Sequence, residues 1–333
     1  MKKKITIITD AWEPQVNGVV TTYTQIVKNS PENVYFDIIQ PDMFPSFKIP
    51  GYEEIRVGIC SYKKMELLLL DFVGYEETYF HIATEGPLGL QAKRVLDRND
   101  IQYTTAYHTK FPEFLYEMYR VPAAFTRSYF NWFHKKSKTV FVPSNSVKNE
   151  NSNWNTTVIS RGYDECFRPI ERSKNDIPVL LYVGRVSLEK NIDAFCNINI
   201  DPCRKIIVGD GPDRRRLQAK YKNVEFVGYK FASELASYYN MADVSVFPSK
   251  TDTFGVVILE SMACGTPVAA YEVTGPIDQI QNGVNGFMAD NLETAVRNCL
   301  NISRETTRKS VENKNWKLVA NEFINYIEEY NES

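Results

Sequence analysis

The stretch VSVFPSKTDTFGVVILESMACGTPVAA, residues 244–270, runs from one apolar strand through a loop and a helix into a second strand. The first apolar run ends at Pro248, and the second begins at Pro267. Between them, a nearly uniformly apolar helix follows Gly255 and ends at Gly265, a residue type that commonly terminates helices. Two buried strands joined by a helix are typical of a parallel α/β sheet.

The same alternation of short β-branched runs and longer helical stretches occupies most of the chain. Strands are predicted at residues 5–9, 34–40, 79–84, 103–107 and 139–143, and again at 179–184, 205–208, 224–227, 244–248 and 267–270. Each run is apolar nearly throughout, as expected of a parallel strand that is buried on both faces. Two successive series predict an α/β fold with two doubly wound, Rossmann-like domains, residues 1–166 and 177–312.

The segments outside these two series have different characters. Residues 167–178 are polar and charged with a proline near each end, which predicts a linker. Residues 315–333 are amphipathic at helical spacing, and we expect a helix that caps one of the domains, for instance by packing back on the first.

Composition excludes several classes of protein. The 333 residues are 43% hydrophobic and 24% charged, which excludes a disordered or fibrous chain. With 39 Lys and Arg against 41 Asp and Glu, the net charge is −2, so we expect no nucleic-acid partner.

The sequence also predicts a cytoplasmic location. No apolar run approaches the roughly 18 residues of a membrane-spanning helix, and no apolar signal region follows the initial Met-Lys-Lys-Lys. The six cysteines contain no CxxC pair, so we expect reduced thiols and neither a disulfide framework nor a zinc site.

In open α/β sheets, ligands bind beyond the carboxyl ends of the strands, so the loops there are the candidate sites. After the first strand, Asn17 and Gly18 open a helix; Gly18 either leaves backbone amides facing an anion or is an ordinary turn glycine. After the strand at 103–107, His108, Lys110 and Glu113 are candidate polar contacts to a ligand. A buried, hydrogen-bonded role for His108 is an equal alternative.

The loop after the strand at 179–184 carries Arg185 and Lys190, five residues apart where a helix begins. An Arg and a Lys that converge on a helix N-terminus form a good diphosphate site, because Arg offers a planar fork and Lys a mobile point charge. The alternative is a solvated basic face. The turn at residues 209–211 is a lone Gly-x-Gly, without the spacing of a dinucleotide site or the Lys of a P-loop.

Two carboxylates stand out in residues 244–270. Asp252 lies in the loop, and Glu260 lies in the apolar helix, where an unpaired carboxylate would cost several kcal/mol. Glu260 therefore needs a partner, which is either a ligand or a structural hydrogen bond.

Taken in this order, these loops resemble the retaining glycosyltransferases of the large family 4, or group 1, type, which includes bacterial mannosyl-, glucosyl- and sulfoquinovosyl-transferases. The most specific stretch runs from Glu225-Phe-Val-Gly-Tyr to Thr274-Gly-Pro276, and Ser160-Arg-Gly-Tyr-Asp164 strengthens it. Residues 8–19 and 108–113 look most like the branch that acts on membrane lipids or cell-surface glycans. The resemblance implies the GT-B fold, with two Rossmann-like domains that face each other across a cleft.

The resemblance also implies roles for individual residues. Arg185 and Lys190 would bind the diphosphate of the donor, Glu260 the ribose hydroxyls, and Asp252 the donor sugar. The family usually has Glu where this chain has Asp252, so the charge is kept and the reach is shorter.

Further positions match the family by the same comparison. His108 would lie near the transferred sugar, and Gly18 would leave room for the diphosphate. Backbone atoms of Phe254, Gly255 and Val256 would contact the donor, and those of Gly228, Tyr229 and Lys230 the nucleobase. The residues Asn17, Lys110 and Glu113 are candidates on the acceptor side.

Cleavage of a sugar–diphosphate bond places negative charge on the leaving group, which preorganised cations and amides can stabilise. The sequence has no Asp-x-Asp, so we expect no metal and no cofactor other than the donor, a UDP- or GDP-sugar. The resemblance implies a front-face displacement to a lipid or glycan acceptor. A non-catalytic nucleotide-sugar-binding protein and an epimerase of the same fold are the alternatives.

The segment 125–138 carries large aromatics and cations, with Phe125, Tyr129, Trp132 and Phe133 at helical spacing. The spacing predicts that these four form one helix face, as in a helix that lies reversibly on a membrane surface or, more commonly, in a core helix with a basic outer side.

Overall fold

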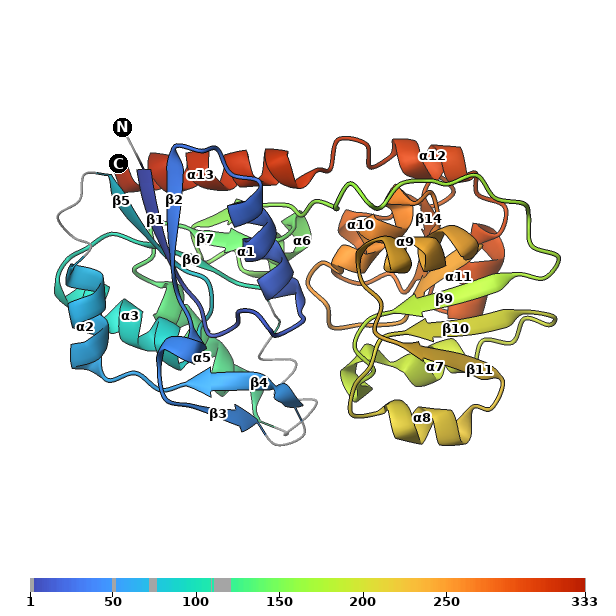
Figure 1. Cartoon of the computed structure of the whole chain (residues 1–333), viewed down its shortest axis with the longest axis horizontal. Coiled ribbons are helices and arrows are strands. Elements are labelled where there is room, and N and C mark those ends of the chain that lie inside the picture. Colours follow the sequence, from blue (N-terminus) through green and yellow to red (C-terminus); the bar gives the residue numbers. More distant parts are fainter. Residues whose placement is uncertain (1–2, 50–51, 72–76, 109, 111–120, 333) are drawn as a thin grey trace. The chain divides into compact units, whose positions relative to one another are not determined.

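The computed structural model describes residues 3–49, 52–71, 77–108, 110 and 121–332 (Figure 1). The chain forms two compact units: unit 1 comprises residues 1–161 and 316–333, and unit 2 comprises residues 162–315. The division falls between Arg161 and Gly162, ahead of the predicted linker. Phe167, at the start of that segment, is buried in the core of unit 2. Further along it, Arg172 donates hydrogen bonds to three backbone carbonyls at residues 240–242, so the segment is fastened to unit 2.

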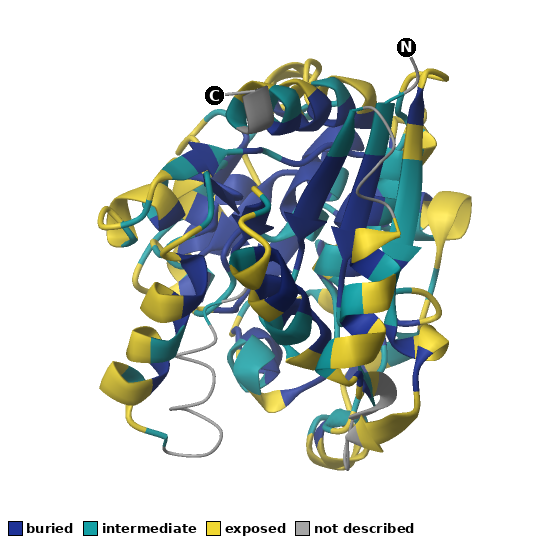
Figure 2. Cartoon of the chain, turned by 90° about the vertical axis from the view of Figure 1, so that its left-hand side faces the viewer, coloured by how far each residue is buried: buried dark blue, intermediate teal, exposed yellow. Residues whose placement is uncertain are grey.

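Unit 1 is built on a six-stranded sheet in which all neighbouring strands are parallel, in the order β2-β1-β5-β6-β7-β8. The strands are β1 (Lys3–Ile8), β2 (Val34–Ile39), β5 (Thr78–Ile82), β6 (Thr104–Ala106), β7 (Val140–Val142) and β8 (Thr156–Val158). The helices are α1 (Gly18–Lys28), α2 (Tyr62–Leu70), α3 (Pro87–Arg98), α5 (Ala123–His134) and α6 (Asn145–Glu150), with a 3₁₀ turn at Pro41–Met43. Figure 2 shows these strands as a buried interior, with exposed residues on the outer sides of the helices.

Alternate residues of the central strands face the two sides of this sheet. Phe80 and Ile82 of β5 pack in one hydrophobic cluster with residues of α2, α3 and α5, such as Phe133. His81, between them in the sequence, contacts Phe323 on the other side of the sheet. Because both faces are covered by helices, the strands are apolar nearly throughout, which is why the sequence revealed them.

The C-terminal helix α13 (Trp316–Glu332) belongs to unit 1, where it lies along α1 and β5 (Figure 1). Its buried apolar residues include Phe323, whose ring also meets Tyr23 of α1 edge to face. Lys3 and Glu328 form an ion pair that ties the helix to the first strand. The amphipathic pattern of the sequence therefore marks the side of α13 that covers the sheet.

Unit 2 repeats the architecture, with a fully parallel sheet in the order β11-β10-β9-β12-β13-β14. The strands are β9 (Val179–Val183), β10 (Arg204–Val208), β11 (Val224–Gly228), β12 (Val244–Phe247), β13 (Val268–Ala270) and β14 (Gly286–Met288). The helices are α7 (Ile192–Cys196), α8 (Arg214–Lys220), α9 (Ala232–Met241), α10 (Val256–Ala263), α11 (Leu292–Cys299) and α12 (Arg304–Lys309), with 3₁₀ turns at Leu188–Lys190 and Pro276–Asp278. Helices α9 and α10 pack on one face, and α7, α8 and α11 on the other.

The sequence did not predict four strands. β8 and β14 are the last strands of their sheets and are only partly buried, so neither shows the apolar run of a central strand. The strands β3 (Ser46–Ile49) and β4 (Tyr52–Gly58) form an antiparallel pair outside the large sheet. Charged residues interrupt both, and neither has the continuous apolar run of a central strand.

Candidate functional site

Three glycines bring the loops after neighbouring strands of unit 2 into backbone contact. Gly184 follows β9, Gly209 follows β10 and Gly228 ends β11, and all three have positive φ angles. A Cβ atom on Gly209 would lie 1.9 Å from the carbonyl oxygen of Gly184, and the amide of Gly209 donates to the carbonyl of Gly228 across 2.8 Å. No other residue fits at Gly209, so the loops that carry Arg185 and Tyr229 are held together at the carboxyl edge of this sheet.

The N-terminus of α10 lies at the same edge, after β12. Gly255 precedes this helix with a φ of +82°, and a Cβ atom there would come within 2.8 Å of the Phe247 ring. Phe254 is buried, and its carbonyl accepts a hydrogen bond from Gln279. The backbone is therefore shaped by glycine so that the first amides of α10, beginning at Val256, lie at the end of the strand, where a helix dipole favours an anion.

Lys190 and Asp252 form an ion pair, with 2.5 Å between Nζ and Oδ1. From the family resemblance, Lys190 was expected to bind the diphosphate of the donor and Asp252 its sugar. Both side chains are about one-quarter exposed, so the pair lies open to solvent on one side. In the structure they neutralise each other, and an incoming diphosphate would compete with Asp252 for Lys190.

Arg185 lies close to this pair. Its backbone carbonyl accepts a hydrogen bond from the buried hydroxyl of Tyr182, at 2.8 Å. Burial raises the pKa of Tyr182 well above its ordinary value; the charge of Asp252 adds to this rise, and that of Arg185 opposes it. Both charges therefore act on the same side chain, which places Arg185, Lys190 and Asp252 in one electrostatic neighbourhood.

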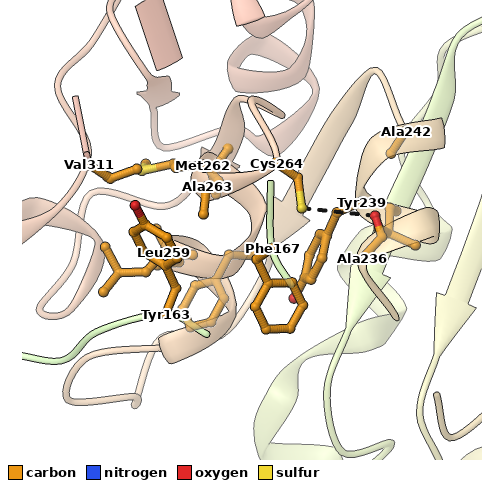
Figure 3. Close-up of a cluster of buried hydrophobic side chains, with 14 of the residues drawn as sticks. Tyr163, Phe167, Ala236, Tyr239, Ala242, Leu259, Met262, Ala263, Cys264 and Val311 are labelled. Carbon is orange, nitrogen blue, oxygen red and sulfur yellow. Dashed lines mark hydrogen bonds between the residues drawn. The ribbon is translucent and has the colours of Figure 1, made fainter. Parts of the chain in front are cut away.

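Glu260 projects from the second turn of α10 and meets Tyr239 of α9. The Tyr239 hydroxyl donates to Oε2 of Glu260 across 2.9 Å. Burial raises the pKa of Glu260 to about 7, the Tyr239 hydrogen bond opposes the rise, and the charge of Asp164 adds to it. Figure 3 shows Tyr239 beside Phe167, with Leu259 farther along the same hydrophobic cluster, which explains the desolvation. The partner that the sequence required is thus a tyrosine, and it satisfies only part of the carboxylate.

Tyr229 and Lys230 follow Gly228 at the surface. The Tyr229 ring stacks on Phe231, its hydroxyl donates to the carbonyl of Asp210 across 3.3 Å, and the residue remains 44% exposed. Lys230 pairs with Glu234 one turn along α9. The two side chains thus have local partners, and the contact of this turn's backbone with the nucleobase stays a prediction.

In unit 1, Asn17 and Gly18 form the start of α1. The side-chain oxygen of Asn17 accepts hydrogen bonds from the amides of Val19 and Val20, both at 3.0 Å, and so caps the helix. Gly18 does not have a positive φ angle, and a Cβ atom on it would meet nothing within 4 Å. Neither backbone conformation nor packing among the described residues explains this glycine, and its contact with a diphosphate stays a prediction.

His108 lies at the end of β6 in a hydrogen-bonded chain. Its Nε2 is 2.9 Å from the Tyr23 hydroxyl, and its Nδ1 is 2.9 Å from an Arg161 nitrogen. Burial lowers the pKa of His108 well below its ordinary value, with the charge of Arg161 adding to the shift. His108 is therefore a neutral, hydrogen-bonded histidine, the alternative left open by the sequence, and that state is compatible with a contact to substrate.

The acceptor-side candidates are partly described. Lys110 forms an ion pair with Glu150 of α6 at 2.7 Å. Glu113 lies outside the described residues. Unit 1 also contains a cavity of about 280 Å³, lined by apolar groups such as Ile59, Leu90 and Tyr129 together with the carboxylate-bearing Glu85.

The aromatic residues of 125–138 do not share one face of α5. Phe133 is fully buried, and Tyr129 donates to the backbone carbonyl of Glu85 at 2.7 Å. By contrast, Phe125 is 76% and Trp132 47% exposed. The pattern of four aromatics thus splits between a core-facing side and a surface-facing side, because positions 132 and 133 are adjacent in the helix and point about 100° apart.

Tyr239, Tyr23 and Arg161 contact candidate site residues but were not predicted as site residues from the sequence. Arg161 was quoted only as part of the Ser160–Asp164 motif, although it is the one charged residue between positions 151 and 163, which was a usable signal. The two tyrosines gave none, since both lie in ordinary helical patterns.

No set of three or more His, Cys, Asp or Glu side chains is grouped as a metal ion would require within residues 3–49, 52–71, 77–108, 110 and 121–332. In the same part of the chain, no helix combines the length and the apolar character needed to cross a membrane.

Comparison with known proteins gives two family matches that adjoin each other. The family model described as Glycosyltransferase Family 4 matches residues 18–165, and the one described as Glycosyl transferases group 1 matches residues 164–301. The junction of the two matches lies within a few residues of the boundary between the two structural units.

Individual relatives match most of the chain. A GDP-mannose-dependent alpha-mannosyltransferase of Mycobacterium tuberculosis is 25% identical over 98% of this chain and 96% of its own. An alpha-monoglucosyldiacylglycerol synthase of Streptococcus pneumoniae is 25% identical over 80% of this chain and 71% of its own. The structure of a sucrose-phosphate synthase from Thermosynechococcus elongatus superposes with a TM-score of 0.78 at 19% identity, covering 98% of this chain and 99% of that one, and it shows the shared GT-B fold. The chain therefore belongs to the group 1, family 4 glycosyltransferases, and it is an enzyme of that class.

Proposed function

We propose that this enzyme transfers a hexose from a nucleoside diphosphate sugar to a lipid or glycan acceptor, with retention of configuration and without a metal ion. Three observations in unit 2 carry the proposal: the Lys190–Asp252 pair, the action of Arg185 and Asp252 on the same tyrosine, and Glu260 on the helix that begins at the glycine-shaped edge of the sheet. Two cations for a diphosphate, a carboxylate for a sugar and a half-satisfied carboxylate for a ribose match the parts of one donor.

The cations would act on the leaving group. As the sugar–phosphate bond breaks, negative charge grows on the diphosphate, and Arg185, Lys190 and the N-terminus of α10 can stabilise it in place. In a front-face displacement, a leaving phosphate oxygen accepts the proton of the acceptor hydroxyl while that hydroxyl oxygen bonds to the anomeric carbon. Arg185 and Lys190 would then supply the charge stabilisation that a metal provides in other transferases.

Unit 1 would bind the acceptor. The relatives named above include an enzyme whose name refers to diacylglycerol, and the cavity beside Leu90 and Tyr129 offers an apolar lining of useful size. The exposed Phe125 and Trp132, with Lys135 and Lys136 at the end of the same helix, would favour reversible contact with an anionic membrane surface on the cytoplasmic side. If the full chain does not bind anionic vesicles at low salt, that contact is excluded.

The test is transfer itself. A screen of UDP- and GDP-sugars by thermal shift identifies the donor, because a ligand that binds only the folded state raises the melting temperature. Incubation of that donor with a polyol or glycolipid acceptor, followed by NMR of the product, should show a new glycosidic bond with the anomeric configuration of the donor. An inverted product would contradict the retaining mechanism, and an altered sugar still attached to its nucleotide would favour the epimerase. Transfer should survive dialysis against EDTA; a complete loss that Mg²⁺ restores would contradict the metal-free mechanism.

A further inference from the structure

Five polar side chains of unit 1 form one continuous chain of short contacts. Arg161 lies 2.9 Å from Nδ1 of His108, and Nε2 of His108 lies 2.9 Å from the hydroxyl of Tyr23. The same hydroxyl lies 2.7 Å from Nε2 of His81, and Nδ1 of His81 lies 2.8 Å from the hydroxyl of Thr104. The chain joins α1, β5, β6 and the segment after β8, and its members are largely buried.

We propose that Arg161, Tyr23 and His81 are positioning residues that hold His108 as a neutral imidazole in one tautomer, with Nδ1 unprotonated and the proton on Nε2. A guanidinium has only donors, so Nδ1 of His108 must accept from Arg161. The proton of a neutral His108 then lies on Nε2 and is donated to the oxygen of Tyr23. The Tyr23 hydroxyl donates in turn to Nε2 of His81, whose own proton lies on Nδ1 and is donated to Thr104.

The reverse direction does not work. If Thr104 donated to His81, and His81 to Tyr23, the Tyr23 hydroxyl would donate to Nε2 of His108. Both ring nitrogens of His108 would then be acceptors, which requires an imidazole with no proton. Arg161 at one end therefore sets the direction of every hydrogen bond in the chain, and the two histidines are opposite tautomers.

The charge of Arg161 makes the arrangement stable to pH. Its side chain is 95% buried and also donates to the carbonyls of Ile159 and Ser160, at 2.6 and 3.0 Å. Burial lowers its pKa only to about 10, so it remains a cation near neutral pH. Among the described residues, the groups that face His108 include Tyr23 from α1, His81 from β5 and Arg161, while Glu85 acts on Tyr23 from the loop after β5. Of these, Arg161 carries the positive charge beside Nδ1, and it opposes protonation of the ring.

The cavity beside this chain is small. Tyr23, His108, Arg161 and Phe323 are among the residues that line a void of about 10 Å³, which holds at most one water molecule. These side chains pack with little space between them, so their hydrogen bonds act on the reaction through the position and tautomer of His108. That last step rests on the proposed function, in which His108 lies near the transferred sugar.

The test is long-range ¹H–¹⁵N NMR of the histidine rings in the full chain, which has only three histidines. We expect His108 to carry its proton on Nε2 and His81 on Nδ1 throughout pH 6–8. His134, whose Nδ1 contacts Thr105, is not part of this series of hydrogen bonds and serves as an internal control. A proton on Nδ1 of His108, or a charged ring at pH 6, would overturn the inference.

Variants separate positioning from packing. In Arg161→Met, which keeps bulk and removes the donor and the charge, His108 should become a mixture of tautomers and turnover should fall about tenfold or more, with the donor KM changed far less. Arg161→Lys keeps a charged donor and should restore a single tautomer and part of the turnover. If Arg161→Met folds and leaves the tautomer of His108 unmixed, the inference is wrong. If the tautomers mix as expected and turnover is unchanged, it is instead the proposed role of His108 in transfer that fails.

Discussion

Replacing Glu260 with Gln should stabilise the unliganded protein above neutral pH while weakening donor binding. Burial raises the pKa of this carboxyl to about 7, against an ordinary value of 4.5. The folded chain therefore holds the proton more tightly than the unfolded chain does. The protonated Glu260 carboxyl contributes its full stability below pH 4.5, and this contribution is lost as the pH rises from 4.5 through 7. The Glu260→Gln variant would have no such loss, and its side-chain amide could still accept the hydrogen bond of Tyr239.

The magnitude follows from the shift. A difference of about 2.5 pKa units at 1.36 kcal/mol each gives an upper value of roughly 3 kcal/mol at pH 8. Partial exposure of the Glu260 side chain allows water to reduce this, so we expect about 1–3 kcal/mol. For a cooperative unit of the size of unit 2, that corresponds to a melting temperature higher by roughly 2–10 °C.

The assay is thermal unfolding of wild type and Glu260→Gln between pH 4.5 and 8, with and without the nucleoside diphosphate. Without ligand, the two curves should coincide near pH 4.5 and separate progressively up to pH 8, with the variant higher. With ligand, wild type should gain stability at pH 8 and the variant little, since the ribose hydroxyls lose a charged acceptor worth roughly 1.5–3 kcal/mol for each bond.

Two results would refute this reasoning. A variant less stable than wild type at pH 8 would mean that the carboxylate is satisfied within the fold, so that its desolvation does not lower the free energy of unfolding. Equal nucleotide affinity in the two proteins would mean that Glu260 does not contact the ribose. Tyr239→Phe is the matched control, because it removes the partner and should raise the pKa of Glu260 further.

The remaining predictions concern the donor and its surroundings. Arg185→Lys and Lys190→Ala should each lower turnover more than donor affinity, because they stabilise charge that grows in the transition state; near-wild-type turnover in both would exclude the diphosphate contact. Asp252→Asn should release Lys190 from its ion pair, so calorimetry should show nucleoside diphosphate binding unchanged or tighter while transfer falls. Gly18→Ala should leave the melting temperature unchanged and reduce transfer, whereas Gly209→Ala, whose Cβ atom would meet a carbonyl oxygen at 1.9 Å, should destabilise unit 2.

The fold was predictable to the extent that strands are buried on both faces. Such strands are apolar at most positions, so β1, β5, β9 and β12 were visible without any knowledge of their neighbours. The strands β8 and β14 were not, because they are partly buried edge strands whose pairing is decided by tertiary context.

The aromatic pattern of α5 shows the same limit from the other side. Spacing along the chain located the helix, but it could not show that Phe133 would be buried and Phe125 exposed. That difference depends on which neighbours the helix meets, and the nearest of them, in α2 and α3, lie some 30 to 70 residues earlier in the sequence.

The candidate site was predictable as a set of positions, and its chemical state was not. Strand ends mark where ligands bind in this class of fold, so Arg185, Lys190, Asp252 and Glu260 could be named from sequence alone. Their states depend on partners brought from elsewhere: Lys190 meets Asp252 across 62 residues of sequence, and Glu260 meets Tyr239 of the preceding helix. The ion pair lies open to solvent on one side, and the carboxyl of Glu260 has a pKa raised to about 7 because it is buried. A donor would replace Asp252 with phosphate as the partner of Lys190 and would offer hydroxyls to Glu260. At Glu260, affinity for the donor would thus arise from pairing a carboxylate that is desolvated in the unliganded fold. This is why Glu260→Gln is expected to raise stability and lower donor binding.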